Sequence, residues 1–277
     1  MTETEIANLA LSLIAGKEMT VMSTDATQQA RVCRKWYSAA RDEALASHPW
    51  NFATKRARLT LTWTALSGVA LADAGASDQI RVTATTHGLT TGNRVHFKEV
   101  EGVSAANGTW YVTVINANTF DLDDSVFSGS HTSGTGKWIL APLFGWDYQH
   151  TKPSDCLRVN KINSLEGNEE DSERYAVEGS KILCDSDEIL LNYVFQETTT
   201  TNWSQEFINA FALVLASYIA QELTGPAGRA SELRAQFERM IAPAAKQRDA
   251  RQGKGRALQP VYDSELVRVR RGFISTH

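Results

Sequence analysis

The apolar residues of this chain follow a helical period near both ends and alternate with polar residues in between. At the start, five apolar side chains fall on one face of a helix predicted over 2–15. Thr2 and Glu5 have the spacing of a capping box, in which each side chain satisfies a backbone amide of the first turn. Gly16 is expected at the C′ position that ends this helix. The five apolar residues are Ile6, Leu9, Ala10, Leu13 and Ile14.

A second helix is predicted to begin at Ser23 or Thr24, because either side chain caps a helix N-terminus well. It should end before Pro49, since the residue ahead of a proline avoids the helical conformation. Its apolar face consists of Cys33, Trp36, Tyr37, Ala40 and Ala44.

Between residues 57 and 141 the pattern changes to short alternating segments separated by turn-forming clusters such as Thr91-Gly92-Asn93 and Asn107-Gly108. Short strands with regular turns favour a small β-sandwich or barrel. The predicted strands are RLTLTW, IRVTATT, RVHFKEV, TWYVTVI, TFDLD and KWILA. A second β region is predicted over 157–196, with the strand LRVNKI, a hairpin in RYAVEGSKILCD that turns at Glu178-Gly179, and the strand EILLNYVF.

The helical period then returns. Asn202 and Gln205 have capping spacing ahead of an apolar helix that ends near Leu223. Its apolar core, residues 207–220, is shorter than the ~20 residues that a membrane-spanning helix needs. A last helix is predicted over 231–251, and Pro243 should kink or break it. Its apolar side carries Leu233, Phe237, Met240 and Ile241.

This order predicts an α+β protein. The N- and C-terminal helices would form a helical bundle, with a β region and an inserted small all-β domain of the sandwich or barrel kind. The expected domains are an adaptor core over 1–59 and 143–250, an inserted β domain over 60–142, and an extended C-terminal tail over 251–277.

Composition limits the classes of function. The formal charge is −4, from 28 Lys and Arg against 32 Asp and Glu, whereas a duplex-DNA binder usually has a basic surplus. The three cysteines, Cys33, Cys156 and Cys184, are far apart, so neither a disulfide framework nor a structural zinc site is expected. The N-terminus has no basic region of the kind that opens a signal peptide. The tail from Gln252 reverses the overall charge, with five basic residues against two acidic ones.

No catalytic motif is found, so the chain is not expected to be an enzyme, and no metal or cofactor site is predicted. The six histidines lack metal-ligand spacing. GTGKW at 134–138 departs from a phosphate loop, because His131 replaces the first glycine and Trp138 the Ser or Thr. Three acidic clusters could serve glycosidic cleavage or calcium binding, but solvated turns also favour Asp. They are Asp121, Asp123 and Asp124; Glu169, Glu170 and Asp171; and Asp185, Asp187 and Glu188.

The segment HPWNFA at 48–53 closes the second helix. A histidine in this position is more often a packed or capping side chain than a catalyst. Trp50 and Phe52 alternate, and in an extended exit both would point to one face. Each can bury ~150–250 Å², so the segment is predicted to anchor the fold rather than bind a ligand.

Several motifs in order resemble the head-to-tail adaptor family of short-tailed phages, also called tail tubular protein A. The resemblance covers about 1–59 and 143–250, and HPWNFA and KPSDCLRV are its most specific parts. It implies that Trp50, Phe52, Pro153, Asp155 and Trp203 are fold anchors. The motifs are LALSLIAGKEM, RDEALASHPWNFATKRARL, GWDYQHTKPSDCLRVNKI, YAVEGSKILCD, ILLNYV and the W-x-x-x-F of Trp203 and Phe207.

Residues 60–142 depart from the family pattern as an insert. It resembles a small β module of phage tail proteins and ubiquitin-activating enzymes, carried by IRVTATTHGLTTGNRVHF, NGTWYVTVINANTFDL and SGTGKW. Two other readings stay open: a virion-associated cell-wall glycan hydrolase, and a glycan- or protein-binding module. The second would use Trp110, Tyr111 and Trp138 of the insert, although strand aromatics mostly pack inward.

The resemblance implies a virion structural protein at the head-to-tail interface, made in the host cytoplasm. Copies would form a twelvefold ring that docks under the portal protein, extends the DNA channel and provides the platform for the tail nozzle protein. A tail fibre or spike is a further expected partner, a membrane is not, and double-stranded DNA would pass without sequence-specific binding. The tail would dock on the portal through Tyr262, Val267, Arg268, Arg270, Arg271 and Phe273.

Overall fold

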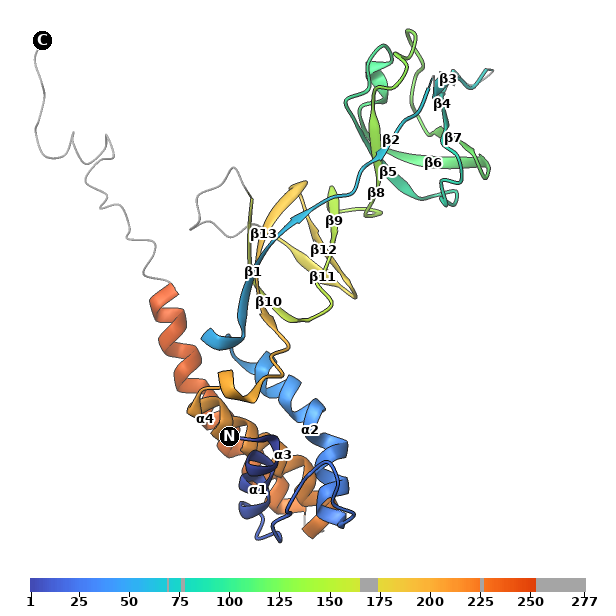
Figure 1. Ribbon diagram of the computed structural model, residues 1–277. Coiled ribbons are helices and arrows are strands. Elements are labelled where there is room, and N and C mark those ends of the chain that lie inside the picture. The colour runs from blue at the N-terminus through green and yellow to red at the C-terminus, as the bar shows by residue number, and fades with distance from the viewer. Residues whose placement is uncertain (69, 76–77, 165–173, 225–226, 253–277) are drawn as a thin grey trace, which may run out of the picture.

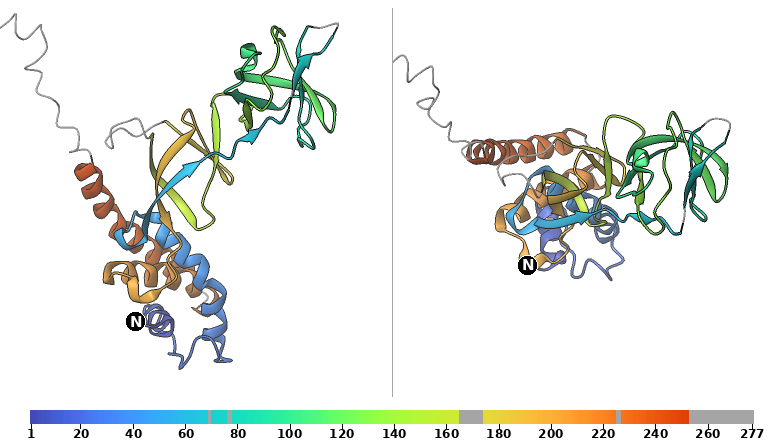
Figure 2. Two further views of the ribbon diagram at one scale, coloured as in Figure 1. Left: turned by 45° about the horizontal axis from the view of Figure 1, so that its top comes forward. Right: turned by 90° about the horizontal axis from the view of Figure 1, so that it is seen from above.

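A computed structural model describes residues 1–68, 70–75, 78–164, 174–224 and 227–252. The protein is α+β and elongated (Figure 1), with helices at one end, two small sheets in the middle and a larger curled sheet at the far end. Two further views show the same separation of the parts (Figure 2). The portal-docking residues predicted at 262–273 lie outside the described residues.

Four helices share one hydrophobic core: α1 (Glu3–Ser12), α2 (Gln28–Ser47), α3 (Gln205–Thr224) and α4 (Ala227–Gln252). α3 packs against each of the other three. This explains its apolar sequence, since a helix that is covered on several sides needs few polar positions. The predicted faces are largely confirmed: Cys33, Tyr37, Ala40 and Ala44 of α2 are buried, while Trp36 is half-buried.

The helix starts show what sequence spacing predicts well and poorly. The capping box of α1 is confirmed, with Thr2 N donating to Glu5 Oε2 at 2.8 Å and Glu5 N donating to Thr2 Oγ1 at 3.3 Å. The predicted start of α2 at Ser23 or Thr24 is wrong, because Thr27 is the N-cap and accepts from Ala30 N.

Three further predictions about the helices are corrected. Gly16 does not take the left-handed conformation that ends α1; Ala15 does, at φ 55°, and Gly16 N donates to Leu11 O. Ser204, not Asn202, caps α3, since its hydroxyl accepts from Phe207 N. α4 begins at Ala227 and continues past Pro243, so that proline does not break it.

The middle of the molecule has two antiparallel three-stranded sheets. In the first, β13 (Glu188–Phe195) lies between β1 (Thr54–Thr60) and β10 (Cys156–Ser164). In the second, β12 (Lys181–Cys184) lies between β11 (Ala176–Glu178) and β9 (Tyr148–Thr151). RLTLTW was predicted as the first strand of the small β-sandwich or barrel, but β1 begins earlier, ends at Thr60 and pairs with β13, so this strand belongs to the middle region. The hairpin turns at Gly179-Ser180, one residue later than predicted, because Glu178 pairs with Lys181.

The far end is one seven-stranded sheet in the order β2-β8-β5-β6-β7-β4-β3. The first half of β6 pairs with β5 and its second half with β7, so the sheet curls around its own core. That core is separate from the helical one and includes Phe97, Phe120 and Trp138. The strands are β2 (Thr64–Ala65), β3 (Leu71–Asp73), β4 (Ile80–Thr83), β5 (Arg94–Lys98), β6 (Gly108–Asn116), β7 (Thr119–Leu122) and β8 (Lys137–Ala141).

Short 3₁₀ helices complete the fold: η1 (Asn51–Ala53), η2 (Ser104–Ala106) and η3 (Thr200–Asn202). η1 replaces the extended exit predicted after α2. Within the described residues, no helix combines the length and apolar character needed to cross a bilayer.

Candidate functional site at the joints of the fold

The segment HPWNFA sits where the helices meet the middle sheets. Trp50 is 7% exposed, and its indole N–H donates to Ala44 O at 2.9 Å. Its ring lies 5.3 Å from that of Phe207 on α3, and Phe52 lies 5.1 Å from the same ring. Although the exit is 3₁₀ rather than extended, both side chains therefore reach the same aromatic residue of the core.

The segment KPSDCLRV also lies at this junction between the helices and the middle sheets. Asp155 accepts from Lys55 Nζ at 2.9 Å and from Tyr193 Oη at 3.1 Å, and Pro153 O accepts from Cys156 N at the start of β10. Arg158 donates to Ala46 O near the end of α2. Burial raises the pKa of Asp155, but the hydrogen bonds from Lys55 and Tyr193 outweigh it and lower that pKa.

Trp203 is the third element of this joint. It is 6% exposed, and its ring lies 4.9 Å from that of Phe207, edge to face. Phe207 therefore contacts aromatic side chains from two segments distant in the sequence. The five residues expected as fold anchors lie where the helices meet the middle sheets, and Trp50 and Trp203 are buried in the helical core.

The acidic clusters do not converge on a common point within the described residues. Asp121 is buried and accepts two hydrogen bonds of 2.7 Å from Arg81. Asp185, Asp187 and Glu188 each pair with a different cation, namely Arg174, Lys98 and Arg58. Glu169, Glu170 and Asp171 lie outside the described residues. No group of three His, Cys, Asp or Glu side chains in the described part of the chain is placed to hold a metal ion.

GTGKW leads into β8. Lys137 of this segment pairs with Glu99 at 2.5 Å. His131 accepts from Ala70 N through Nδ1 at 3.1 Å, and its Nε2 lies 3.1 Å from Thr135 O. The histidine that departs from the phosphate-loop pattern therefore organises a turn.

The aromatic residues of the insert divide into three cases. Trp138 is buried in the core of the curled sheet, as expected for a strand aromatic. Trp110 is half-buried and donates to Ala106 O at 2.8 Å. Tyr111 is 48% exposed, so the inward packing predicted for all three fails at this position.

A second joint, which the sequence did not predict, connects the curled sheet to the middle sheets. Lys98 on β5 pairs with Asp187, just before β13, at 2.6 Å. Its ammonium lies 5.2 Å from the Trp63 ring and 5.4 Å from the Tyr148 ring. A cation over aromatic faces is attracted by their quadrupoles. We call Trp63, His96, Lys98, Tyr148 and Asp187 the joint cluster.

Electrostatics favour the charged pair in the joint cluster. The hydrogen bond from Lys98 lowers the pKa of Asp187. Burial, followed by the nearby charge of Lys98, lowers the pKa of His96, so its imidazole is neutral at pH 7. His96 Nδ1 lies 2.6 Å from Thr109 Oγ1. A neutral histidine beside a lysine avoids repulsion between two cations.

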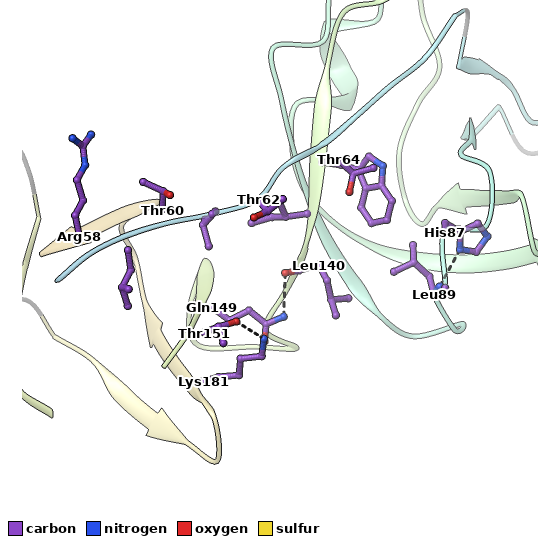
Figure 3. Close-up of a pocket in the computed structure, with 15 residues that line it drawn as sticks. Arg58, Thr60, Thr62, Thr64, His87, Leu89, Leu140, Gln149, Thr151 and Lys181 are labelled. Atoms are coloured by element: carbon purple, nitrogen blue, oxygen red, sulfur yellow. Dashed lines mark hydrogen bonds between the residues drawn. The ribbon is translucent and has the colours of Figure 1, made fainter. Parts of the chain in front are cut away.

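A groove of about 610 Å³ is lined by the chain neighbours of two joint-cluster residues, Thr62 and Thr64 on either side of Trp63 and Gln149 after Tyr148 (Figure 3). One wall is the chain over 58–64, the opposite wall includes Gln149, Thr151 and Lys181, and His87 and Leu89 approach from the curled sheet. Gln149 donates to Leu140 O at 3.2 Å and Lys181 to Thr151 Oγ1 at 3.0 Å, which orders this wall. The groove has a mixed lining of threonine and leucine side chains together with Arg58 and Lys181.

Comparison with known proteins gives one family match. Residues 80–137 match the ubiquitin-activating enzyme E1 FCCH domain, which agrees with the resemblance predicted for this segment. Among solved structures, phage phi92 endosialidase is similar at 23% identity and a TM-score of 0.20, over 31% of this chain and 12% of that one. The chain thus spans a small part of that protein, and so slight a likeness carries no argument about function. Comparison with curated proteins finds no match.

Proposed function

We propose that this chain is a virion structural protein, a head-to-tail adaptor of a short-tailed phage. Copies form a twelvefold ring that docks under the portal, extends the DNA channel and carries the tail nozzle. In this proposal, α1 to α4 are the helical bundle of an adaptor core over 1–59 and 143–250. Residues 60–142 are an insert, and residues 251–277 reach the portal.

One observation carries the proposal. The motifs that resemble the adaptor family come from three distant segments, and they meet at one place in the fold. Arg158 of KPSDCLRV bonds the end of the helix that leads into HPWNFA, and Trp50 and Trp203 both contact Phe207. A family core would bring its characteristic segments together in this way.

The charge of the chain supports the same function. Each phosphate that a protein neutralises adds to its affinity for DNA, and this contribution falls as the salt concentration rises. A channel wall has to let DNA slide, and a formal charge of −4 suits that task. The alternative of a glycan hydrolase has less support, since a described carboxylate such as Asp121 is held by Arg81 in an ion pair.

The proposal is tested by silencing expression of this protein during phage growth and imaging the particles by electron microscopy. Heads with portals but without tails are expected, and supplying the intact chain from a plasmid should restore tails. Tailed, infective particles assembled in its absence would overturn the proposal. Cell-wall clearing by the purified chain would favour the hydrolase instead.

A further inference from the structure

The curled sheet is attached to the rest of the protein at the joint cluster. In the described part of the chain, none of its seven strands pairs with a strand of the middle sheets, and the two regions have separate cores. The chain crosses between them twice, over 61–63 and over 142–147. Domains that share only a small interface are expected to move relative to one another. The side chains at the joint therefore decide how firmly the curled sheet is held.

Two large aromatic residues of the joint cluster belong to none of the three hydrophobic cores found among the described residues. They are Trp63, from the first crossing of the chain, and Tyr148, which follows the second. Tyr148 is nevertheless only 7% exposed. Both rings lie edge-on to the ring of His96 on β5, at 5.9 Å and 5.2 Å between centroids. These two residues therefore form a contact between the two parts and are not needed to fill the core of either.

The charged groups that face His96 come from three places in the chain. Arg94 and Lys98 share its face of β5, because alternate residues of a strand point to the same side. Asp147 precedes β9 and Asp187 precedes β13. Burial is the largest cause of the lowered pKa of His96, the two cations lower that pKa further, and the two carboxylates raise it. Part of this burial comes from the two aromatic rings across the joint, so it is lost when the curled sheet moves away.

We propose that the joint cluster is a latch, which holds the curled sheet against the middle sheets at neutral pH and releases it when His96 takes up a proton. In the docked state a charged imidazole would lie away from water and beside Lys98, whereas in the released state it is hydrated. The pKa of His96 is therefore lower in the docked state than in the released one. It follows that docking is stable above the ordinary value of 6.5 and weakens as the pH falls below it.

The ion pair of the joint cluster responds at a lower pH than the histidine does. The hydrogen bond from Lys98 lowers the pKa of Asp187 from its ordinary value of 3.8, so this carboxylate keeps its charge while His96 takes up a proton. Release through His96 and release through Asp187 are thus separate steps. The latch is a property of the chain by itself and does not rest on the proposed function.

The test follows the separation of the two parts in the full chain by single-molecule fluorescence energy transfer, as the pH is lowered from about 8 to about 5. p-Acetylphenylalanine replaces Val126 in the curled sheet region and Val177 on β11, which are 67% and 44% exposed. The dyes are attached to these ketones, so the three buried cysteines stay unlabelled. We expect one transfer efficiency at neutral pH, and a second one from released molecules that grows as the pH falls below 6.5.

Substitutions of His96 make the test specific. His96→Gln removes the proton site and should move the release midpoint down by about two pH units, to where carboxylates titrate. His96→Lys carries the charge permanently and should show the released state at neutral pH. His87→Gln is the matched control, because the ring nitrogens of His87 lie within hydrogen-bonding distance of Asn116 O and Leu89 N; it should release like the unmodified chain. The proposal is overturned if the unmodified chain keeps one efficiency throughout, or if His96→Gln leaves the midpoint unchanged.

A second measurement does not depend on a variant of His96. Titration of its ring signals by nuclear magnetic resonance in the unmodified chain should give a pKa below 6.5. Trp63→Ala removes one ring from across the joint and should raise that pKa towards the ordinary value, while the helical circular-dichroism signal stays unchanged. A pKa of His96 that Trp63→Ala does not alter would contradict the coupling between docking and proton binding.

Discussion

Replacing Trp50 with alanine should destabilise the helical part of the protein by about 3–5 kcal/mol. A tryptophan buries about 150–250 Å², which corresponds to roughly 4–6 kcal/mol at about 25 cal/mol per Å². The side chain is 7% exposed and also donates a hydrogen bond to Ala44 O, worth about 1 kcal/mol net. Partial relaxation around the cavity brings the expected loss into the range found for large core truncations.

The assay is urea unfolding followed by the helical circular-dichroism signal, because the curled sheet has its own core and can unfold separately. Trp50→Phe is a matched variant that keeps most of the ring contact with Phe207 and should lose only about 1–2 kcal/mol. Phe144→Ala, at a position that is 80% exposed, should stay within about 0.5 kcal/mol of the unmodified chain. A loss below about 1 kcal/mol for Trp50→Ala would refute the assignment of this residue as a core anchor.

Three further predictions concern the curled sheet and its joint. Phe120→Ala should destabilise the curled sheet by about 3–5 kcal/mol, because Phe120 is fully buried there. It should leave the unfolding transition of the helices unchanged. Unfolding followed by both tryptophan fluorescence and circular dichroism would separate the two transitions. Gly102→Ala should lower the thermal stability more than Gly88→Ala does. Both glycines have positive φ, but a Cβ at Gly102 would collide with Ser130 O, whereas Gly88 faces open space. Equal losses of stability for the two variants would contradict this. Since Lys98 lowers the pKa of Asp187, their pair holds above that pKa and is lost as pH falls through it. Small-angle scattering should therefore show the joint loosening in acid, and Asp187→Asn should loosen it at neutral pH.

Hydrophobic periodicity predicted those helices and strands in which the buried positions recur with the period of the element. The strand EILLNYVF matches β13 residue for residue, because its alternation matches one buried and one more exposed face. The start of α2 was missed because hydrogen bonds within the preceding loop decide it. Asp25 accepts from Thr20 N and Val21 N, which holds the chain in a turn where Ser23 and Thr24 would otherwise cap a helix.

The anchors were predictable and the joint cluster was not. HPWNFA has three large side chains within one short segment, so its packing role is visible in the sequence. Lys98, Tyr148 and Asp187 are far apart in the chain and look like ordinary strand and turn residues. Only the pairing of β5 with β8, and the path of the chain back to β9, brings them together. A lysine is recognised as part of a site only when its neighbours in space are known.

The most direct test of the adaptor proposal is the solution mass, measured by light scattering, of the chain alone and mixed with the portal ring of the same phage. The account predicts a complex with the mass of the portal ring plus twelve copies. It also predicts that this complex is lost when the chain is truncated at Gln252, since the tail carries Arg268, Arg270 and Arg271. A chain that does not bind the portal at physiological salt would contradict the account, and would shift attention to the inserted sheet as a tail-fibre or glycan-binding module.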